Sequence, residues 1–424
     1  MQTQNFGLKN STKDAWKSQD NRYKILWISF LPPTRSPRDA GSQSFSYYYY
    51  NICNDNRFNV KLIANVVRDL NALEEENSKY DHRFIFTKND SIFKKVCNIE
   101  SKINPYTKYA KLISNYLAKT FISELKGLKE TGYSPDIVIL EWTQTVVLAE
   151  IVKILFPFAK IVATEQDVAF VGYERKAEYY RGARGLISKV RAKTEKNLEI
   201  RSLELCDLVI PMNADNGALL IREGIDSDVI WGMSPYFHSM LSLKRMPKTR
   251  DILFFGAMNR EENILSVKWF VHEVMPLLDN RFRFVILGGN PTDDVRRLAS
   301  ERVVVTGFVQ DTDPYFAECL CMVVPLVLGA GIKVKVLEGL SAGIPVVSNE
   351  IGIEGIHAEN GKDYLAAESP EEFSRAITRL RDEPGLADRL SVSSRNYMLE
   401  HFSYENSLEG YKERLLALAR NGLG

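Results

Sequence analysis

Two lysines and a glutamate follow a glycine-rich loop near residue 330, and residues of these types could bind an anion. The loop is Gly329-Ala330-Gly331, and it comes directly after the uncharged run Cys319–Pro325. Glycines allow a ligand to approach the backbone closely, because they lack a Cβ and adopt positive φ. Lys333 and Lys335 supply two cations, and Glu338 follows about one helical turn further on. The spacing suits a phosphate group beside a carboxylate that could accept a hydrogen bond from a hydroxyl.

The surrounding pattern predicts a strand, a loop, a helix and a second strand. An uncharged apolar run as short as 319–325 is typical of a strand that is buried on both faces. From Ile332 the apolar residues recur every three or four positions, which predicts a helix that Gly343 and Pro345 end. A helix that begins after a glycine loop presents free N–H groups and favours an anion. A plain βαβ unit, with Lys335 and Glu338 as a surface ion pair, fits the same pattern, and the motif leaves both interpretations open.

The run PLVLGAGIKVKVLEGLSAGIPVVS at 325–348 resembles the donor-nucleotide motif of family 4 retaining glycosyltransferases, which have the GT-B fold. The resemblance implies that the loop from Gly329 to Ile332 lies against the donor diphosphate. It also implies that Lys333 and Lys335 take the usual basic positions and that Glu338 binds the ribose. Many relatives carry a second glutamate, which contacts the donor sugar, where this chain has Ala330. The resemblance therefore implies a nucleotide-sugar site without that carboxylate.

Four further positions resemble the family in part. Gly256 and Arg260 fall in the first loop of the donor domain, where many members have an Arg and a Lys that reach the diphosphate. Gly307 falls where the family places the base of the nucleotide. Gly41 belongs to a loop rich in Pro, Gly and Ser (31–43), which resembles the first loop of the acceptor domain. The resemblance implies that all four positions border the donor.

Asp167 follows the predicted strand Lys160–Thr164, in the sequence Glu165-Gln166-Asp167. Relatives often carry a His-Asp pair near the acceptor at this place, so Gln166 departs from the histidine and Asp167 keeps the acid. The resemblance implies that Asp167 orients the acceptor, and that the reaction depends on it together with Lys335 and Glu338. It implies no enzymic nucleophile. An Asp after a strand is equally suited to capping the next helix, and the sequence leaves both roles open.

A chain of 424 residues is too long for one ordinary hydrophobic core, so two domains are expected. Strand and helix patterns alternate in both halves, whereas residues 67–105 are weakly patterned. With the resemblance, this predicts the GT-B fold: two Rossmann-like α/β domains that face each other across a cleft. The predicted parts are a polar tail (1–22), an acceptor domain (23–237), a linker (238–250), a donor domain (251–402) and a C-terminal helix that crosses back to the first domain (403–424).

Composition limits the partners. The net charge is +1, which gives no general reason to bind nucleic acid. The five cysteines are few and lack a C-x-x-C pair, and neither an apolar leader nor a membrane-spanning run is evident, so a cytoplasmic protein is predicted. The basic segment Arg181–Lys196 is either a solvated helical face or a peripheral contact with an anionic membrane.

No metal or other cofactor is expected. Asp311-Thr312-Asp313 spells the metal motif of a different glycosyltransferase fold, but Pro314 follows it, and a carboxylate or Thr before Pro favours a helix start. The predicted activity is transfer of a sugar from a nucleoside-diphosphate sugar to a saccharide or lipid-linked acceptor. The resemblance implies retention of configuration and a common setting in cell-surface polysaccharide biosynthesis. A nucleotide-sugar epimerase and a non-catalytic nucleotide-sugar binder on the same scaffold are the alternatives.

Overall fold

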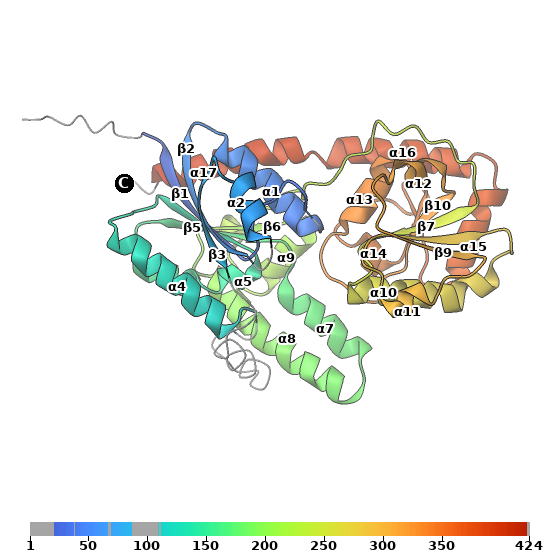
Figure 1. Cartoon of the computed structure of the whole chain (residues 1–424). Coiled ribbons are helices and arrows are strands. Elements are labelled where there is room, and N and C mark those ends of the chain that lie inside the picture. The colour runs from blue at the N-terminus through green and yellow to red at the C-terminus, as the bar shows by residue number, and fades with distance from the viewer. Residues whose placement is uncertain (1–20, 38, 67–68, 87–108, 110–111, 422–424) are drawn as a thin grey trace, which may run out of the picture.

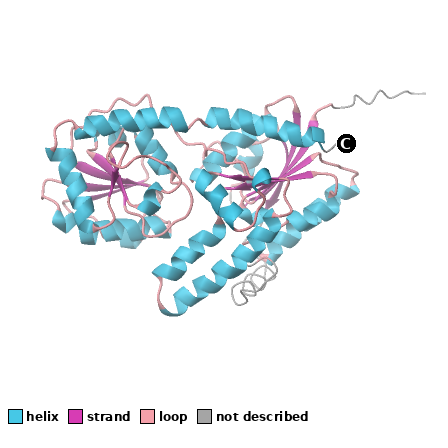
Figure 2. Cartoon of the chain, turned by 180° about the vertical axis from the view of Figure 1, so that it is seen from behind, coloured by secondary structure: helices cyan, strands magenta, loops and turns pink. Residues whose placement is uncertain are grey.

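The computed structural model describes residues 21–37, 39–66, 69–86, 109 and 112–421. It contains two six-stranded parallel sheets, each with helices packed against it, and a long helical segment runs along both (Figure 1). Most of the predicted polar tail (1–22) lies outside the described residues. Figure 2 shows from behind that each sheet is enclosed by helices, as expected for parallel strands that are buried on both faces.

The strand order is the same in both sheets. The first sheet runs β3-β2-β1-β4-β5-β6 and the second runs β12-β11-β10-β7-β8-β9. The first set is β1 (Tyr23–Ser29), β2 (Phe58–Val66), β3 (Asp81–Phe86), β4 (Ile137–Glu141), β5 (Lys160–Glu165) and β6 (Leu208–Pro211). The second set is β7 (Asp251–Phe255), β8 (Arg283–Leu287), β9 (Val303–Gly307), β10 (Cys321–Val324), β11 (Val346–Ser348) and β12 (Leu365–Ala366). In each sheet the order reverses beside its first strand, which is where open α/β sheets bind ligands.

Helices connect the strands. Those around the first sheet are α1 (Ala40–Cys53), α2 (Leu70–Glu76), α4 (Asn115–Glu130), α5 (Thr143–Val146), α6 (Ala149–Leu155), α7 (Ala169–Tyr179), α8 (Gly182–Leu203) and α9 (Ala214–Arg222), followed by the 3₁₀ turn η1 (Ser227–Val229). Those around the second are α10 (Glu261–Trp269) with the turns η2 (Phe270–Val274) and η3 (Met275–Leu277), α11 (Asp293–Arg296), α12 (Asp313–Glu318), α13 (Val334–Ser341), α14 (Glu350–Ile353), α15 (Pro370–Asp382) and α16 (Leu386–His401). The last helix is α17 (Tyr404–Asn421).

The C-terminal helix crosses back onto the first domain. Residues of α16 belong to the core around the second sheet, whereas Leu408, Tyr411 and Leu415 of α17 pack into the core around the first. Tyr411 meets Trp27 of β1 edge to face, with 6.4 Å between ring centroids. Such aromatic contacts stabilise beyond the area they bury. The segment at the top of Figure 1 is therefore anchored in both domains.

The structure adds a strand to the weakly patterned region and corrects one local expectation. The weakly patterned region contains β3, an edge strand that pairs with β2 from Lys61↔Asp81 to Val66↔Phe86. An edge strand has only one neighbouring strand, so few of its residues need to be apolar. The apolar pattern that predicts a strand is therefore weak in this region. The sequence predicts Gly41 in a loop, but it lies in the first turn of α1, because Asp39 caps that helix by accepting a hydrogen bond from Ser42 N at 2.8 Å.

Candidate active site

The glycine loop and the start of α13 form one wall of a cavity of about 340 Å³ between the two domains. The other wall comes from the start of α1, with its N-cap Asp39 and Gln43, and from Asp167 after β5. Both walls lie at the carboxyl ends of strands beside the points where the strand order reverses. The cavity is therefore where this topology is expected to place a ligand.

Lys335 does not form a surface pair with Glu338, so that interpretation of the motif is wrong. Its Nζ donates to Asn263 Oδ1 at 2.7 Å and lies 4.4 Å from the ring centroid of Phe254. Burial lowers the pKa of Lys335 to about 7, and the nearby Arg260 adds to this. Glu338 is 8% exposed, and burial raises its pKa to about 8. Near neutral pH this wall can thus gain positive charge when an anion arrives.

Lys333 points inward and joins an ion-pair cluster that ties the two domains together. Its Nζ lies 3.1 Å from Glu354 Oε2, and it also donates to the carbonyl of Gly331. Arg175 of α7 holds the same carboxylate with both terminal nitrogens, at 2.6 and 2.8 Å, and donates to the carbonyl of Gly329. Burial alone would raise the pKa of Glu354, but the hydrogen bonds from Arg175 and the charge of Lys333 lower it. The cluster fixes the glycine loop against the first domain.

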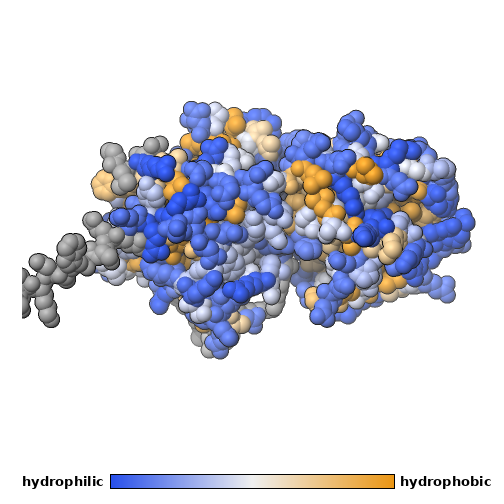
Figure 3. All heavy atoms as spheres, turned by 90° about the horizontal axis from the view of Figure 1, so that it is seen from above, coloured by the Kyte–Doolittle hydropathy of each residue, from blue (hydrophilic) through white to orange (hydrophobic). Residues whose placement is uncertain are grey.

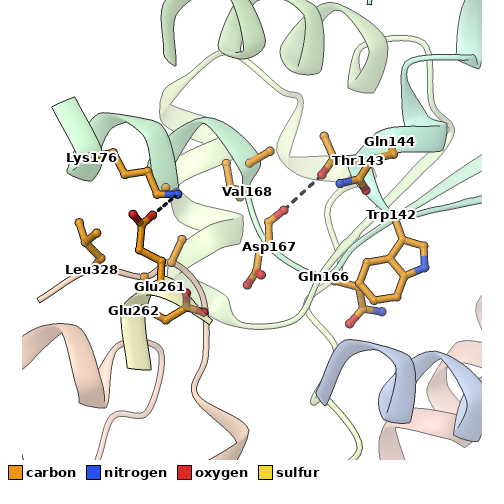
Figure 4. Close-up of a pocket in the computed structure, with 14 residues that line it drawn as sticks. Trp142, Thr143, Gln144, Gln166, Asp167, Val168, Lys176, Glu261, Glu262 and Leu328 are labelled. Carbon is orange, nitrogen blue, oxygen red and sulfur yellow. Dashed lines mark hydrogen bonds and ion pairs between the residues drawn. The ribbon is translucent and has the colours of Figure 1, made fainter. Parts of the chain in front are cut away.

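A second interdomain cluster forms around Glu261 at the start of α10. Lys176 Nζ lies 3.1 Å from Glu261, Tyr180 Oη donates to it at 2.7 Å, and Arg184 also pairs with it. Arg184 of the basic segment and the preceding Lys176 thus hold the second domain. Figure 4 shows Lys176 and Glu261 facing each other at one side of the cleft.

Asp167 does not cap a helix, so the capping interpretation is wrong. Helix α7 begins at Ala169, and Glu199 of α8 accepts from the backbone N–H groups of Ala169 and Phe170 at 3.0 and 3.2 Å. Because Glu199 performs the capping, the Asp167 side chain is left to face the cleft, where it lines three adjoining cavities. Its Oδ1 lies against Gly331 so closely that a Cβ there would overlap it.

The surroundings of Asp167 raise its pKa to about 6, chiefly through burial, while Lys333 and Arg260 act in the opposite direction. The carboxylate is nevertheless exposed to cleft water, although the walls of both domains surround it. Water screens charge, so the full upward shift of the pKa applies when a ligand or domain closure removes that water. Asp167 is thus a carboxylate that a ligand can desolvate.

Gln166 is oriented by a buried network behind the cleft. Its Nε2 donates to Glu141 Oε1 at 2.8 Å, and Trp27 Nε1 donates to the other oxygen at 3.2 Å. Burial raises the pKa of Glu141 to about 7, although these hydrogen bonds favour its charged form. With its nitrogen engaged, Gln166 has its carbonyl oxygen left for a ligand.

The structure brings most of the predicted site residues together. Gly256, Arg260, Gly329, Ala330, Lys333, Lys335 and Glu338 line the cavity already described, and Gly41 and Ile332 line a neighbouring one of about 670 Å³ that also borders Asp167. Gly331 contacts Asp167 as above. Gly307 ends β9 and lines none of these three cavities. Arg260 pairs with Glu262 at 2.5 Å, which the sequence pattern did not indicate.

The Asp-x-Asp motif begins a helix, as its neighbouring proline indicated. Asp311 Oδ1 accepts from the backbone N–H of Asp313 at 3.0 Å, and α12 starts there with Pro314 in its first turn. Throughout the part of the chain that the structure describes, no three His, Cys, Asp or Glu side chains converge as metal ligands would.

The sequence did not indicate four residues that shape the cleft: Trp142, Arg175, Glu262 and the buried Glu199 behind it. The sequence shows Trp142 only as the end of a strand, and Arg175 and Glu199 lie in a highly charged helical segment where many similar residues surround them. Their roles depend on partners that are remote in sequence, such as Glu354 for Arg175. The one signal that could have indicated Trp142 is its position at the end of a strand, because parallel strands present their carboxyl ends to ligands.

Comparison with known proteins identifies the class. The whole chain has the GT-B fold, because it resembles solved glycosyltransferases of that architecture over nearly its full length. The Anabaena protein Alr3699/HepE in complex with UDP has 13% identity and a TM-score of 0.61, and the match covers 93% of this chain and 100% of that one. Sucrose-phosphate synthase from Thermosynechococcus elongatus has 15% identity and a TM-score of 0.66, covering 94% and 100%. These identities are low and speak for the fold alone.

The sequence of the second domain also resembles a known family. Residues 249–383 match the model of the family described as Glycosyl transferases group 1. The match lies within the C-terminal domain and agrees with the predicted resemblance to glycosyltransferases, and the predicted GT-B fold is confirmed. A comparison with curated proteins finds no match.

Proposed function

We propose that the protein is a retaining glycosyltransferase that moves a hexosyl group from a nucleoside-diphosphate sugar to a saccharide or lipid-linked acceptor. The observation that carries this proposal is the interdomain cavity, in which Lys333, Lys335, Arg260 and the start of α13 face the free carboxylate of Asp167. One wall offers cations and helix N–H groups to a diphosphate, and the other offers a hydrogen-bond acceptor to a hydroxyl.

On this proposal the donor lies along the glycine loop. Glu338 accepts hydrogen bonds from the ribose, and Lys335 and Lys333 face the diphosphate. One solved relative, Alr3699/HepE from Anabaena, was crystallised in complex with UDP-glucose, which supports a donor of this kind. Side chains and a helix end supply enough positive charge for the diphosphate, so we propose that the reaction requires no metal cofactor.

The proposed chemistry is a single exchange at the anomeric carbon. The acceptor oxygen forms a bond to this carbon while the bond from the carbon to the diphosphate oxygen breaks. The acceptor proton passes to the leaving phosphate on the same face of the sugar, which accounts for retention without an enzymic nucleophile. Asp167 positions the acceptor hydroxyl, and Lys335 stabilises the charge that develops on the diphosphate. Domain closure excludes water that would otherwise hydrolyse the donor.

We place this activity in cell-surface polysaccharide biosynthesis in the cytoplasm, with a peripheral contact to anionic membrane. In the described ranges, no helix combines the length and apolarity that crossing a bilayer requires. The end of α7 and the first turns of α8, which together we call the α7–α8 turn, expose large apolar side chains, Tyr179 (45%), Leu186 (65%) and Ile187 (58%). Arg181, Lys189 and Lys193 are exposed beside them. The face crossed by α16 and α17, on the other side of the molecule, is mostly hydrophilic with scattered apolar areas (Figure 3). The α7–α8 turn is therefore the surface that we propose for the membrane.

A non-catalytic nucleotide-sugar binder is the second candidate. Ala330 cannot contact a donor sugar with a carboxylate, and Arg260 is engaged by Glu262, so two expected donor contacts are weakened. Asp167 favours transfer, because a binder has no use for a carboxylate held at the junction of three cavities. An epimerase would act without an acceptor, so a donor assay with and without acceptor separates the three.

The test is a thermal-shift screen against UDP, GDP, ADP, dTDP and CMP, alone and as sugar conjugates. We expect one nucleoside diphosphate to raise the melting temperature. Glu338→Ala should weaken its binding about tenfold or more, because a hydrogen bond to a carboxylate is lost. Lys335→Ala should lower turnover more than affinity, by about 10²-fold. Wild-type activity in both variants, or no shift with any nucleotide, would contradict the proposal.

A further inference from the structure

A tryptophan with an unusual backbone stands at the acceptor side of the cleft. Trp142 directly follows β4 and adopts φ 76° and ψ 143°, a region that residues with a side chain rarely occupy. It borders two cavities, of about 300 and 670 Å³, that both reach Asp167. Backbone strain of this kind persists where the surrounding structure enforces it, and it is concentrated at functional sites.

Packing contacts hold the indole of Trp142 in place, but its N–H group has no hydrogen-bond partner in the residues that the structure describes. Its edge packs on Gly41, where an added Cβ would lie 2.5 Å from Cη2 and 2.7 Å from Cζ3, so the position of the ring requires a glycine in α1. The indole Nε1 is buried and has no hydrogen-bond partner among the described residues. Packing alone explains neither the strain nor the unpaired N–H, because both reduce stability.

The polar groups around the smaller cavity mostly accept hydrogen bonds, with Gln144 able to donate as well as accept. Gln166 has its carbonyl oxygen left, because Glu141 holds its nitrogen. Asp167 adds a carboxylate whose side chain makes no hydrogen bond within the described part of the chain, and Glu262 adds one that pairs with Arg260. The one lysine in the lining, Lys176, is already paired with Glu261. In Figure 4, Trp142 and Gln166 lie on one side of Asp167, and Lys176 and Glu261 on the other.

This polarity is opposite to that of the donor side. The cations Lys333, Lys335 and Arg260 line the cavity toward α13 and are absent from the lining of the smaller one, although Arg260 also borders the larger cavity beside Trp142. A ligand of the smaller cavity must therefore donate hydrogen bonds. Hydroxyl and ammonium groups donate, whereas a carboxylate or phosphate would meet the unpaired carboxylate of Asp167 as a like charge.

We propose that Trp142 is the platform on which one sugar ring of the acceptor lies, and that this ring is neutral or carries an amine and bears no acidic group. The proposal rests on the proposed function and adds the substrate class of its acceptor site. The apolar face of the sugar packs on the indole, and its hydroxyls donate to Gln166, Asp167 and Glu262. Trp142 is then a specificity-determining residue that touches the acceptor and takes no part in donor binding.

The test uses octyl glycosides as probes, below their micelle concentrations, with the full-length protein. Three sugars are compared in both the gluco and galacto configurations: the neutral hexose, its 2-amino derivative and its uronic acid. Ligand-observed NMR measures each dissociation constant. We expect a neutral or amino probe to bind at least about tenfold more tightly than the matching uronic acid, because the latter brings a like charge to the carboxylates. Equal or tighter binding of the uronic acid, or no binding of any probe, would overturn the proposal.

Variants of Trp142 separate a sugar platform from a structural role. Trp142→Ala should weaken binding of the best probe at least about fivefold, and Trp142→Phe should restore part of it, because an aromatic face is regained. Trp142→Gly should melt at a higher temperature than Trp142→Ala, since glycine adopts this backbone without strain, and yet should bind the probe no better. Unchanged probe affinity in Trp142→Ala would show that the ring only fills space.

The donor provides an independent readout. Binding of the nucleoside diphosphate found in the thermal-shift screen should be the same in wild type and all three variants. Failure of that screen with normal probe binding would refute the proposed function and leave the sugar site standing. Normal nucleotide binding with no preference for the neutral or amino probe would refute the acceptor class alone.

Discussion

Oδ1 of Asp167 lies directly against Gly331, so that the acceptor-side carboxylate and the donor-side loop touch across the cleft. The two residues come from different domains and are far apart in the sequence. Gly331 has φ 69°, and a Cβ there would overlap the carboxylate. The contact determines how closely the two halves of the proposed site can approach, and therefore where the acceptor hydroxyl meets the donor.

Gly331→Ala should abolish most of the activity because it pushes Asp167 away from the loop. The left-handed backbone also costs an alanine about 1–2 kcal/mol. Gly361→Ala is the matched control, since Gly361 has φ 82° and no atom within 4 Å of an added Cβ. Both variants should lose similar stability in denaturant unfolding, and only Gly331→Ala should lower kcat, by about tenfold or more. Equal kcat losses in the two variants would show that strain alone matters.

Donor affinity should decrease as pH rises from 7 to 9. Burial lowers the pKa of Lys335 to about 7, so above that pH an anionic diphosphate binds only with uptake of a proton. The affinity then falls by up to about tenfold per pH unit. The phosphate itself titrates near pH 6, below this range. Isothermal titration with the identified nucleoside diphosphate measures the slope.

Two variants identify the group whose titration causes this pH dependence of donor affinity. Lys335→Met should remove the pH dependence. Glu338→Gln should keep it, although the pKa of Glu338, raised by burial to about 8, falls in the same range. A slope that survives in Lys335→Met would assign the proton to another group of the cavity, such as Lys333, whose pKa burial also lowers.

Arg175→Ala should loosen the closed arrangement of the domains. The guanidinium holds Glu354 with two hydrogen bonds and the carbonyl of Gly329 with a third, so its loss frees the glycine loop. We expect a larger radius of gyration by solution X-ray scattering and a kcat lowered by about tenfold, because the cleft no longer excludes water. Arg283→Ala is the control: its ion pair with Asp251, at 2.7 Å, joins two strands of one sheet. An identical scattering profile for Arg175→Ala would contradict the assignment.

Removing the exposed charges at the α7–α8 turn should weaken vesicle binding. Each basic residue near an anionic surface contributes about 1 kcal/mol, so the triple variant of Arg181, Lys189 and Lys193 to Ala should lower the partition coefficient about 100-fold. Co-sedimentation with vesicles containing about 30% phosphatidylserine, which gives a strong surface potential, measures it. Arg184 is left intact because it holds Glu261.

The control for this experiment carries the same charge change elsewhere. Lys119, Lys126 and Lys129 are exposed on α4. Their triple alanine variant should bind vesicles as the wild type does. Equal losses in both triple variants would indicate a general effect of net charge, and no loss in either would favour a solvated face.

Local sequence determined the second domain in detail. The uncharged run before residue 325 became β10, the three-and-four spacing after Ile332 became α13, and Gly343 ended that helix at φ 70°. These elements follow from interactions between near neighbours, namely burial of both strand faces, backbone hydrogen bonds within a turn and the freedom of glycine. The position of Lys333, Lys335 and Glu338 at one helix start follows for the same reason.

Tertiary structure decided what those residues do. Sequence left Asp167 equally suited to capping and to a ligand, and the choice was made by Glu199, which lies 32 positions further along the chain and caps α7 in its place. Lys335 donates to Asn263 and does not pair with Glu338. Arg175 and Lys176 of α7 pair with Glu354 and Glu261 of the other domain. A charged side chain selects among several partners within reach, and only the packed fold determines which of them is near. The sequence therefore determined which elements and residues border the cleft, and the contacts between the two domains determined what each of these residues does.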